Sequence, residues 1–177
     1  MNTLASGQSV QEPIERHILS VIVDNEPGVL ARVASLFSGR GYNIESLTVT
    51  ETQHDSHISR LTIVTRGTSS TVAQIRSQLN RLVPVHRVID LTLEGLFVER
   101  ELCLVKVAGT GEARQEALRL AQAFGARTLD ATLNSFVFEL AAGSDAIERF
   151  INVMATVGLV DVCRTGSAAT TRGAGAV

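Results

Sequence analysis

The chain has 177 residues, of which 45% are hydrophobic and 19% are charged, and its formal net charge at pH 7 is −2. This length suits one ordinary domain or two small ones. The near-neutral charge, the absence of Trp and the single Tyr argue against nucleic-acid binding, which needs basic and aromatic surfaces. No apolar run approaches the roughly 18 residues of a membrane span, and the first 13 residues lack the regions of a signal peptide. We therefore expect a soluble, cytoplasmic protein.

The first half of the chain predicts elements in the order β-α-β-β-α-β. Residues 16–23 are β-branched and apolar, as in a buried strand. After Pro27, apolar residues recur at helical spacing from 29 to 37, and a pair of glycines then ends the pattern. The remaining elements are strands at 43–52 and 58–66, a helix capped by Ser69 or Ser70, and a strand after Pro84.

The second half repeats this order with little similarity in sequence. Strands and helices alternate between residues 101 and 166, with a turn near Asn134. The halves therefore predict an α+β protein made of two tandem split β-α-β units, each a four-stranded antiparallel sheet with two helices on one face. The predicted divisions are a flexible N-terminal arm (1–15), a first domain (16–94), a linker (95–99), a second domain (100–165) and a disordered tail (166–177).

Two short segments resemble catalytic or phosphate-binding motifs. Residues 54–57 contain Ser, Asp and two His, but four consecutive hairpin residues cannot align as nucleophile, base and orienting acid. No further metal ligands join the two histidines, so a solvated turn is expected. Residues 109–114 have two glycines of a phosphate loop, but Arg114 replaces the third, which favours a tight turn. We predict no catalytic and no metal-binding residue.

Cys103 and Cys163 lie on the first and last predicted strands of the second half. A sheet order of 4-1-3-2 would pair these strands and make the two thiols neighbours. In a reducing compartment we expect small core residues and no disulfide.

The turn from Asn25 to Leu30 is the stronger candidate for a binding site. A helix N-terminus offers free N–H groups and a partial positive charge, which suit a carboxylate. Gly28 lets a ligand approach the backbone, and the Asn25 amide both donates and accepts hydrogen bonds. Val29 and Leu30 supply an apolar edge. A purely structural turn with a capping Asn explains the same residues equally well.

One known family resembles almost the whole chain. The runs NEPGVLARV and RGYNIESLTV, within residues 24–49, are similar to the start of the small regulatory subunit of acetolactate synthase (acetohydroxyacid synthase). That start is an ACT domain, a ferredoxin-like sensor of amino acids. SRLTIVTRG, VERELCLVKV and VCRTG extend the resemblance over residues 17–166.

The resemblance implies a regulatory subunit that is not an enzyme on its own. Such a subunit binds a large catalytic subunit carrying thiamine diphosphate, magnesium and FAD, and this chain would hold no cofactor itself. The small subunit of this family raises the activity of the large subunit and confers feedback inhibition by valine, and in some members by leucine or isoleucine. By position in the family motif, the effector-binding residues would be Asn25, Gly28, Val29, Leu30, Asn43 and Ile44.

The two ends of this predicted site are too far apart for one ligand in one chain. A helix of roughly 12 residues between Asn25 and Asn43 spans about 18 Å. If the second strand is a sheet edge, two chains can pair edge to edge in a homodimer. We therefore expect valine between two ACT domains, with its carboxylate on the amides of residues 28–30.

Two other classes of protein stay open as alternatives. A stand-alone ACT sensor of amino acids would have no synthase partner, and it need not carry the second half of this chain. An RNA-binding pair of ferredoxin-like sheets would need aromatic strand motifs and a basic face, and this sequence has neither.

Overall fold

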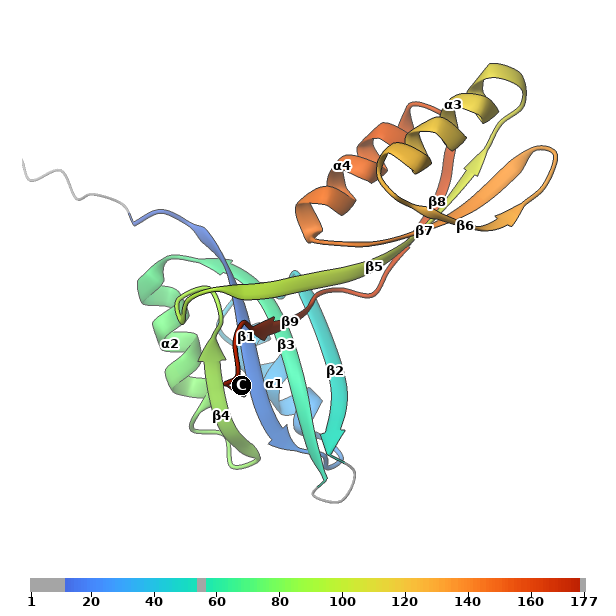
Figure 1. Cartoon of the computed structure of the whole chain (residues 1–177). Coiled ribbons are helices and arrows are strands. Elements are labelled where there is room, and N and C mark those ends of the chain that lie inside the picture. Colours follow the sequence, from blue (N-terminus) through green and yellow to red (C-terminus); the bar gives the residue numbers. More distant parts are fainter. Residues whose placement is uncertain (1–11, 54–56, 176–177) are drawn as a thin grey trace, which may run out of the picture.

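The computed structural model describes residues 12–53 and 57–175, which form two α+β lobes joined by one long strand (Figure 1). Each lobe contains four strands and two helices in the order β-α-β-β-α-β. The predicted fold class, two tandem ferredoxin-like units, is therefore confirmed. Within these described residues, no helix has both the length and the apolar character needed to cross a membrane.

The first lobe is an antiparallel sheet in the order β2-β3-β1-β4. Its strand β1 pairs with both β3 and β4, so β2 and β4 form the two edges. The predicted edge position of the second strand is thus confirmed. The elements are β1 (Glu15–Asp24), α1 (Val29–Ser38), β2 (Ser46–Gln53), β3 (Ile58–Gly67), α2 (Ser69–Leu79) and β4 (Val85–Asp90).

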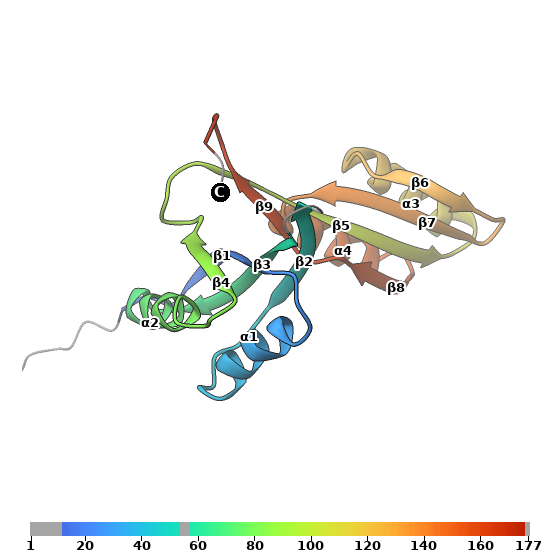
Figure 2. The same cartoon turned by 90° about the horizontal axis from the view of Figure 1, so that it is seen from below.

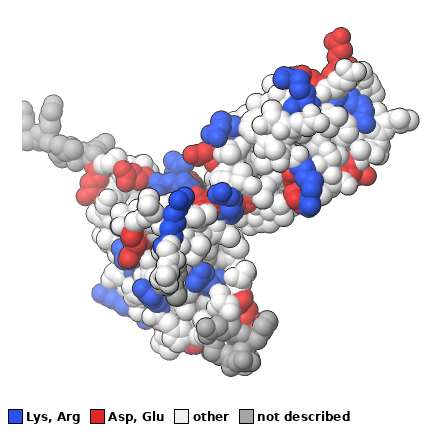
Figure 3. Space-filling model, in the orientation of Figure 1, with Lys and Arg blue, Asp and Glu red and all other residues white. Residues whose placement is uncertain are grey.

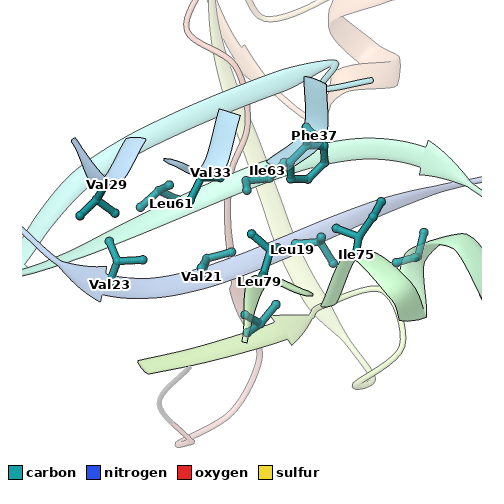
Figure 4. Close-up of a cluster of buried hydrophobic side chains, with 12 residues drawn as sticks. Leu19, Val21, Val23, Val29, Val33, Phe37, Leu61, Ile63, Ile75 and Leu79 are labelled. Carbon is teal, nitrogen blue, oxygen red and sulfur yellow. The ribbon is translucent and has the colours of Figure 1, made fainter. Parts of the chain in front are cut away.

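The core of the first lobe lies between this sheet and its two helices (Figure 4). Alternate residues of β1 point toward the helices, beginning with Leu19 and Val21, as the period of two in a strand requires. Helix α1 contributes Val29, Val33 and Phe37, which are at most 4% exposed. Their spacing is that of one helical face, and it fixes the side of α1 that faces solvent.

The second lobe repeats this architecture with the strand order β6-β7-β5-β8. This is the predicted order 4-1-3-2 counted from the opposite edge. Phe138, Phe150 and Met154 are fully buried in its core. The elements are β5 (Phe97–Ala108), α3 (Gly111–Ala123), β6 (Arg127–Ala131), β7 (Ser135–Ala142), α4 (Ser144–Ala155), β8 (Leu159–Arg164) and β9 (Ala168–Thr171).

The start of β5 and the short strand β9 form a ribbon that the sequence did not predict. Phe97 pairs with Thr171 and Arg100 pairs with Ala168. Figure 2 shows this ribbon on the side of the first sheet opposite α1 and α2. The predicted linker at 95–99 is therefore wrong from residue 97 onward, and the predicted disordered tail is wrong for residues 168–171.

The physical reason for the ribbon is a second apolar face on the first sheet. Phe97 and Ala169 pack against four buried side chains on the face that the helices leave open. Without this cover those side chains would be in water, at about 25 cal/mol per Å² of apolar surface. The small residues of the tail are not a sign of disorder, because they let the ribbon lie close to the sheet. The covered residues are Ile18, Val64, Ile89 and Leu91.

Several element ends differ from the sequence-based expectations. Helix α2 is capped by Thr68, whose side chain accepts a hydrogen bond from the Thr71 amide, and not by Ser69 or Ser70. The predicted flexible arm already contains ordered contacts at its end. The Glu12 carboxylate accepts hydrogen bonds from the amide and hydroxyl of Ser70, at 3.1 and 2.8 Å, next to the positive end of α2. The rest of that arm, residues 1–11, lies outside the described residues.

We predict that Ala169→Asp destabilises the protein by about 2 to 4 kcal/mol, because it buries a carboxylate against an apolar face. Urea unfolding at pH 7, followed by circular dichroism, measures the change. Ala168→Asp is the matched control, since Ala168 is exposed on the same strand. Equal effects of the two substitutions would contradict the proposed cover.

Candidate functional site

The turn between β1 and α1, together with the first two residues of α1, carries four of the six predicted effector residues. The backbone amide of Asn25 donates a hydrogen bond of 2.6 Å to the carbonyl oxygen of His57, and this bond connects the turn to the β2–β3 hairpin. Gly28 precedes the first helical residue with φ of 90°, in the left-handed region. A Cβ at Gly28 would meet no atom within 4 Å, so the space before this backbone is open.

The next two predicted residues have different surroundings. The Val29 side chain is 4% exposed and faces the core beside Val23 (Figure 4), so it cannot form the predicted apolar edge. Its backbone amide donates to the carbonyl of Glu26 over 3.4 Å, a long hydrogen bond. The Leu30 side chain is 47% exposed and is the apolar group available to a ligand on this turn.

The N-terminus of α1 has neither a side-chain cap nor an acidic residue in its first turn, whereas each other described helix has one of the two. Thr68 caps α2 through its side chain, and the first turns of α3 and α4 contain Glu112 and Asp145. Helix α1 has no side-chain cap and no acidic residue in its first turn. Among the four helices of the described residues, α1 alone offers its first amide groups and partial positive charge without a side-chain acceptor from its own cap or first turn. This end therefore suits an external carboxylate.

Asn43 and Ile44 lie beyond the other end of α1. The Asn43 carbonyl accepts a hydrogen bond of 2.6 Å from the Thr65 hydroxyl, and its side chain is exposed. Ile44 packs partly against the first core. Helix α1 has 10 residues, shorter than the predicted 12, and still spans about 15 Å. The structure thus brings residues 25–30 together but does not bring them to residues 43–44 within one chain.

A cleft between the two lobes contains polar residues that the sequence analysis missed. It has a volume of about 620 Å³ and is lined from both lobes by charged and hydroxyl side chains, together with the apolar residues Leu47 and Val64. Figure 3 shows basic and acidic side chains side by side where the lobes meet. Arg16 of the first lobe donates to Glu99 at 3.0 Å, and Arg164 donates to both oxygens of Glu101, at 2.6 and 2.9 Å.

The charges at this junction are held in pairs that favour their ionised forms. Burial raises the pKa of Glu99, but hydrogen bonds from Arg16 and Ser167 outweigh it and leave the pKa below its usual value. Hydrogen bonds to Glu101 raise the pKa of Arg164, so its guanidinium stays charged. The Ser144 hydroxyl at the start of α4 donates to both Glu99 and Glu101, at 3.0 and 3.2 Å. One connected network therefore fixes the second lobe against the first.

The two weaker sequence candidates are the segments at 54–57 and 109–114. Residues 111–114 of the glycine-rich segment form the first turn of α3, where the Arg114 guanidinium lies 3.8 Å from the centroid of the Phe136 ring. Residues 54–56 of the candidate hairpin lie outside the described residues. Within the remainder of the chain that is described, no three His, Cys, Asp or Glu side chains could hold a metal ion.

The two cysteines are both free, as expected, but they are not the predicted neighbours. Leu104, not Cys103, pairs with Cys163, so the two side chains lie on opposite faces of the second sheet. Cys103 is buried in the core, and burial raises the pKa of its thiol to about 11. Cys163 is exposed, so its assignment as a core residue was wrong.

Comparison with known proteins places both lobes in one family. Residues 19–87 match a family model described as an AHAS small subunit-like ACT domain, and residues 100–173 match one described as the small subunit of acetolactate synthase. The chain belongs to the acetolactate synthase small-subunit family. The second match extends through β9, so the family model includes the tail that covers the first sheet.

Individual relatives of the family agree along nearly the full length. The probable acetolactate synthase small subunit of Archaeoglobus fulgidus is 44% identical over 89% of this chain and 98% of its own. The isozyme 3 small subunit of Salmonella typhimurium is 43% identical over 89% and 96%. The crystal structure of the acetolactate synthase small subunit from Thermotoga maritima superposes with a TM-score of 0.80 at 35% identity, covering 90% of this chain and 99% of that one.

We predict that Glu99→Gln lowers the free energy of unfolding at pH 7 by about 1 to 3 kcal/mol, because Arg16 loses its ionised partner in a partly buried site. The pKa of Glu99 is lowered on folding, so its stabilising effect is complete above the unfolded value of about 4.3 and is lost as pH falls through the folded value. The difference from the unsubstituted protein should therefore shrink with acidification in urea titrations between pH 7 and pH 3.

The control for this prediction is Glu116→Gln. Glu116 is exposed and pairs with Arg119 within α3, so its loss should leave the unfolding midpoint unchanged at both pH values. If Glu99→Gln lowers the free energy of unfolding by the same amount at pH 3 and pH 7, the charge of Glu99 is not the cause of the loss.

Proposed function

We propose that this chain is the regulatory subunit of an acetolactate synthase in branched-chain amino-acid biosynthesis. It binds the large catalytic subunit, raises its activity and confers inhibition by valine. In this proposal the thiamine diphosphate, magnesium and FAD belong to the large subunit, and this chain contributes no catalytic group. The matches over both lobes to small-subunit models support the assignment.

The observation that carries the effector proposal is the open, uncapped start of α1. In the proposed complex the valine carboxylate accepts hydrogen bonds from the amides of residues 28–30, where α1 has neither a cap nor an acidic residue in its first turn. The absence of a Cβ at Gly28 leaves room for that carboxylate. The Asn25 amide lies on the same turn and binds the ammonium group through its side-chain oxygen. Leu30 contacts the valine side chain.

The remaining two effector residues come from a second copy of the chain. Strand β2 is an edge of the first sheet, so two copies can pair through it about a two-fold axis. This pairing brings Asn43 and Ile44 of one copy toward the start of α1 in the other. Exposed Leu30 on α1 and Val49 on β2, at 47% and 45%, support an additional apolar contact on this side. The proposed effector-binding form is therefore a homodimer.

The alternative is a stand-alone sensor of amino acids with an ACT domain. It explains the first lobe but gives no reason for a second lobe that matches the small subunit of acetolactate synthase over residues 100–173. The synthase assignment accounts for both lobes, so we favour it.

Reconstitution tests this proposed function directly. The purified chain is mixed with the large catalytic subunit, and acetolactate formation is measured with and without valine, leucine or isoleucine. We expect the mixture to exceed the large subunit alone in activity and to be inhibited by valine. If the mixture has the same activity and the same sensitivity to valine as the large subunit alone, the assignment is refuted.

We predict that Gly28→Asp removes inhibition by valine and leaves activation of the large subunit intact. The new carboxylate occupies the position of the valine carboxylate and repels it. Loss of these charge-assisted hydrogen bonds should raise the valine concentration for half-maximal inhibition by about tenfold or more. Asp is among the residues best tolerated in the left-handed region, so the fold should persist.

Gly111→Asp is the matched control for this substitution. Gly111 also has a positive φ, of 57°, lies at the start of a helix and has no atom within 4 Å of an added Cβ. It belongs to the second lobe, so its substitution should leave inhibition by valine unchanged. Retained valine inhibition in Gly28→Asp would remove this turn from the effector site.

A further inference from the structure

The two lobes touch directly at the first residue of β2. The Ser167 amide donates a hydrogen bond of 3.0 Å to the Ser46 hydroxyl oxygen. Gly166, with φ of 81°, lies against the same side chain, and a Cβ there would collide with Ser46 Oγ and reach 3.2 Å from Thr48 Oγ1. A Cβ at this position would displace the Ser46 hydroxyl, and the positive φ also favours glycine. These contacts, Ser46 with Gly166 and Ser167, are called the β2 joint below.

The first-lobe side of the β2 joint leads directly to the proposed effector residues. Asn43 lies three residues before Ser46, a distance of about 10 Å along an extended chain. The segment between them is attached to β3, because the Asn43 carbonyl accepts from the Thr65 hydroxyl and the Glu45 amide donates 2.8 Å to the Val64 carbonyl. Asn43 and the start of β2 are therefore held on the same neighbouring strand, β3.

The second-lobe side of the β2 joint leads to the polar network between the lobes. Ser167 is 1% exposed, and its hydroxyl donates to Glu99, the partner of Arg16. Gly166 and Ser167 connect β8, an edge of the second sheet, to β9, which covers the first sheet. Ser167 therefore touches both the first lobe and the polar network between the lobes, beside the cleft of about 620 Å³.

From this placement we infer that the β2 joint transmits effector binding to the orientation of the second lobe. The inference rests on the proposed function, because it assumes an effector at Asn43 and Ile44. A ligand shifts an equilibrium between two arrangements only through contacts that differ between them. The hydrogen bond from Ser167 to Ser46 and the close contact at Gly166 are such contacts. They couple the ACT domain to the rest of the subunit.

Two substitutions break the β2 joint in different ways. Ser46→Ala removes the acceptor of the Ser167 amide and changes no backbone angle. Gly166→Ala introduces the collision with Ser46. Gly173→Ala is the matched control, since Gly173 lies in the same tail with φ of 90° but has no atom within 4 Å of an added Cβ. Circular dichroism and thermal melts check that each full-length variant is folded.

Three measurements separate coupling from binding. Calorimetry gives the valine affinity of the chain alone, and assays with the large subunit give activation and inhibition. For Ser46→Ala and Gly166→Ala we expect activation to persist, the valine affinity to change by less than about twofold, and the concentration for half-maximal inhibition to rise by about tenfold. Gly173→Ala should behave as the unsubstituted chain. Hydrogen exchange at residues 165–171 should change on addition of valine in the unsubstituted chain and not in Ser46→Ala.

The possible failures are distinguishable. If the unsubstituted chain shows neither valine binding nor inhibition, the proposed function fails and the inference fails with it. If the unsubstituted chain is inhibited and Ser46→Ala is inhibited to the same degree, the β2 joint is not the route and the proposed function stands. Should Gly166→Ala fail to fold, Ser46→Ala alone decides. Lost valine binding in Ser46→Ala would assign Ser46 to the effector site and overturn the coupling role.

Discussion

The arrangement of the whole chain depends on the burial of the second apolar face of the first sheet. A sheet with both helices on one side leaves its other side in water, and here that side presents Ile18, Val64, Ile89 and Leu91. The ribbon of β5 and β9 covers them with Phe97 and Ala169 (Figure 2). Because β5 continues into the centre of the second sheet, one strand of 12 residues serves both lobes. The hydrophobic effect that completes the first lobe therefore also positions the second.

Once the ribbon lies on the sheet, the polar groups around it must find partners. Ser167 is buried and Glu99 is partly buried at this contact, so an unpaired carboxylate there would be costly. Arg16 from the first lobe and Ser144 from the second donate hydrogen bonds to the Glu99 carboxylate. Such a pair adds little net stability, because desolvation offsets the attraction between the charges. We therefore interpret the network as fixing the relative orientation of the two lobes, since its hydrogen bonds form together only in one orientation.

The fold was predictable from local patterns, and the contact between the lobes was not. Periods of two and 3.6 residues identified the strands and helices, and the family motif led to Asn25 and Gly28. The same patterns gave no information about β9, because Ala168–Thr171 has small residues and no alternation of polar and apolar side chains. Its strand character comes from pairing with β5, more than 60 residues away. Val29 was misjudged for a different reason, since its place in the helix pattern already indicated a core position. A buried helix position cannot also serve a ligand with its side chain.

In the proposed coupling, the strength of the β2 joint would limit how strongly an effector can act through it. A single hydrogen bond contributes about 1 kcal/mol net, which changes an equilibrium constant about fivefold. A homodimer contains two such joints, and if both respond together the factor becomes about thirtyfold. That range is typical of allosteric coupling. The same symmetry that would complete each effector site from two chains would thus also double the free energy available for regulation. A monomer would lack both the second half of the site and the second joint, so dimer formation and sensitivity to the effector should be lost together.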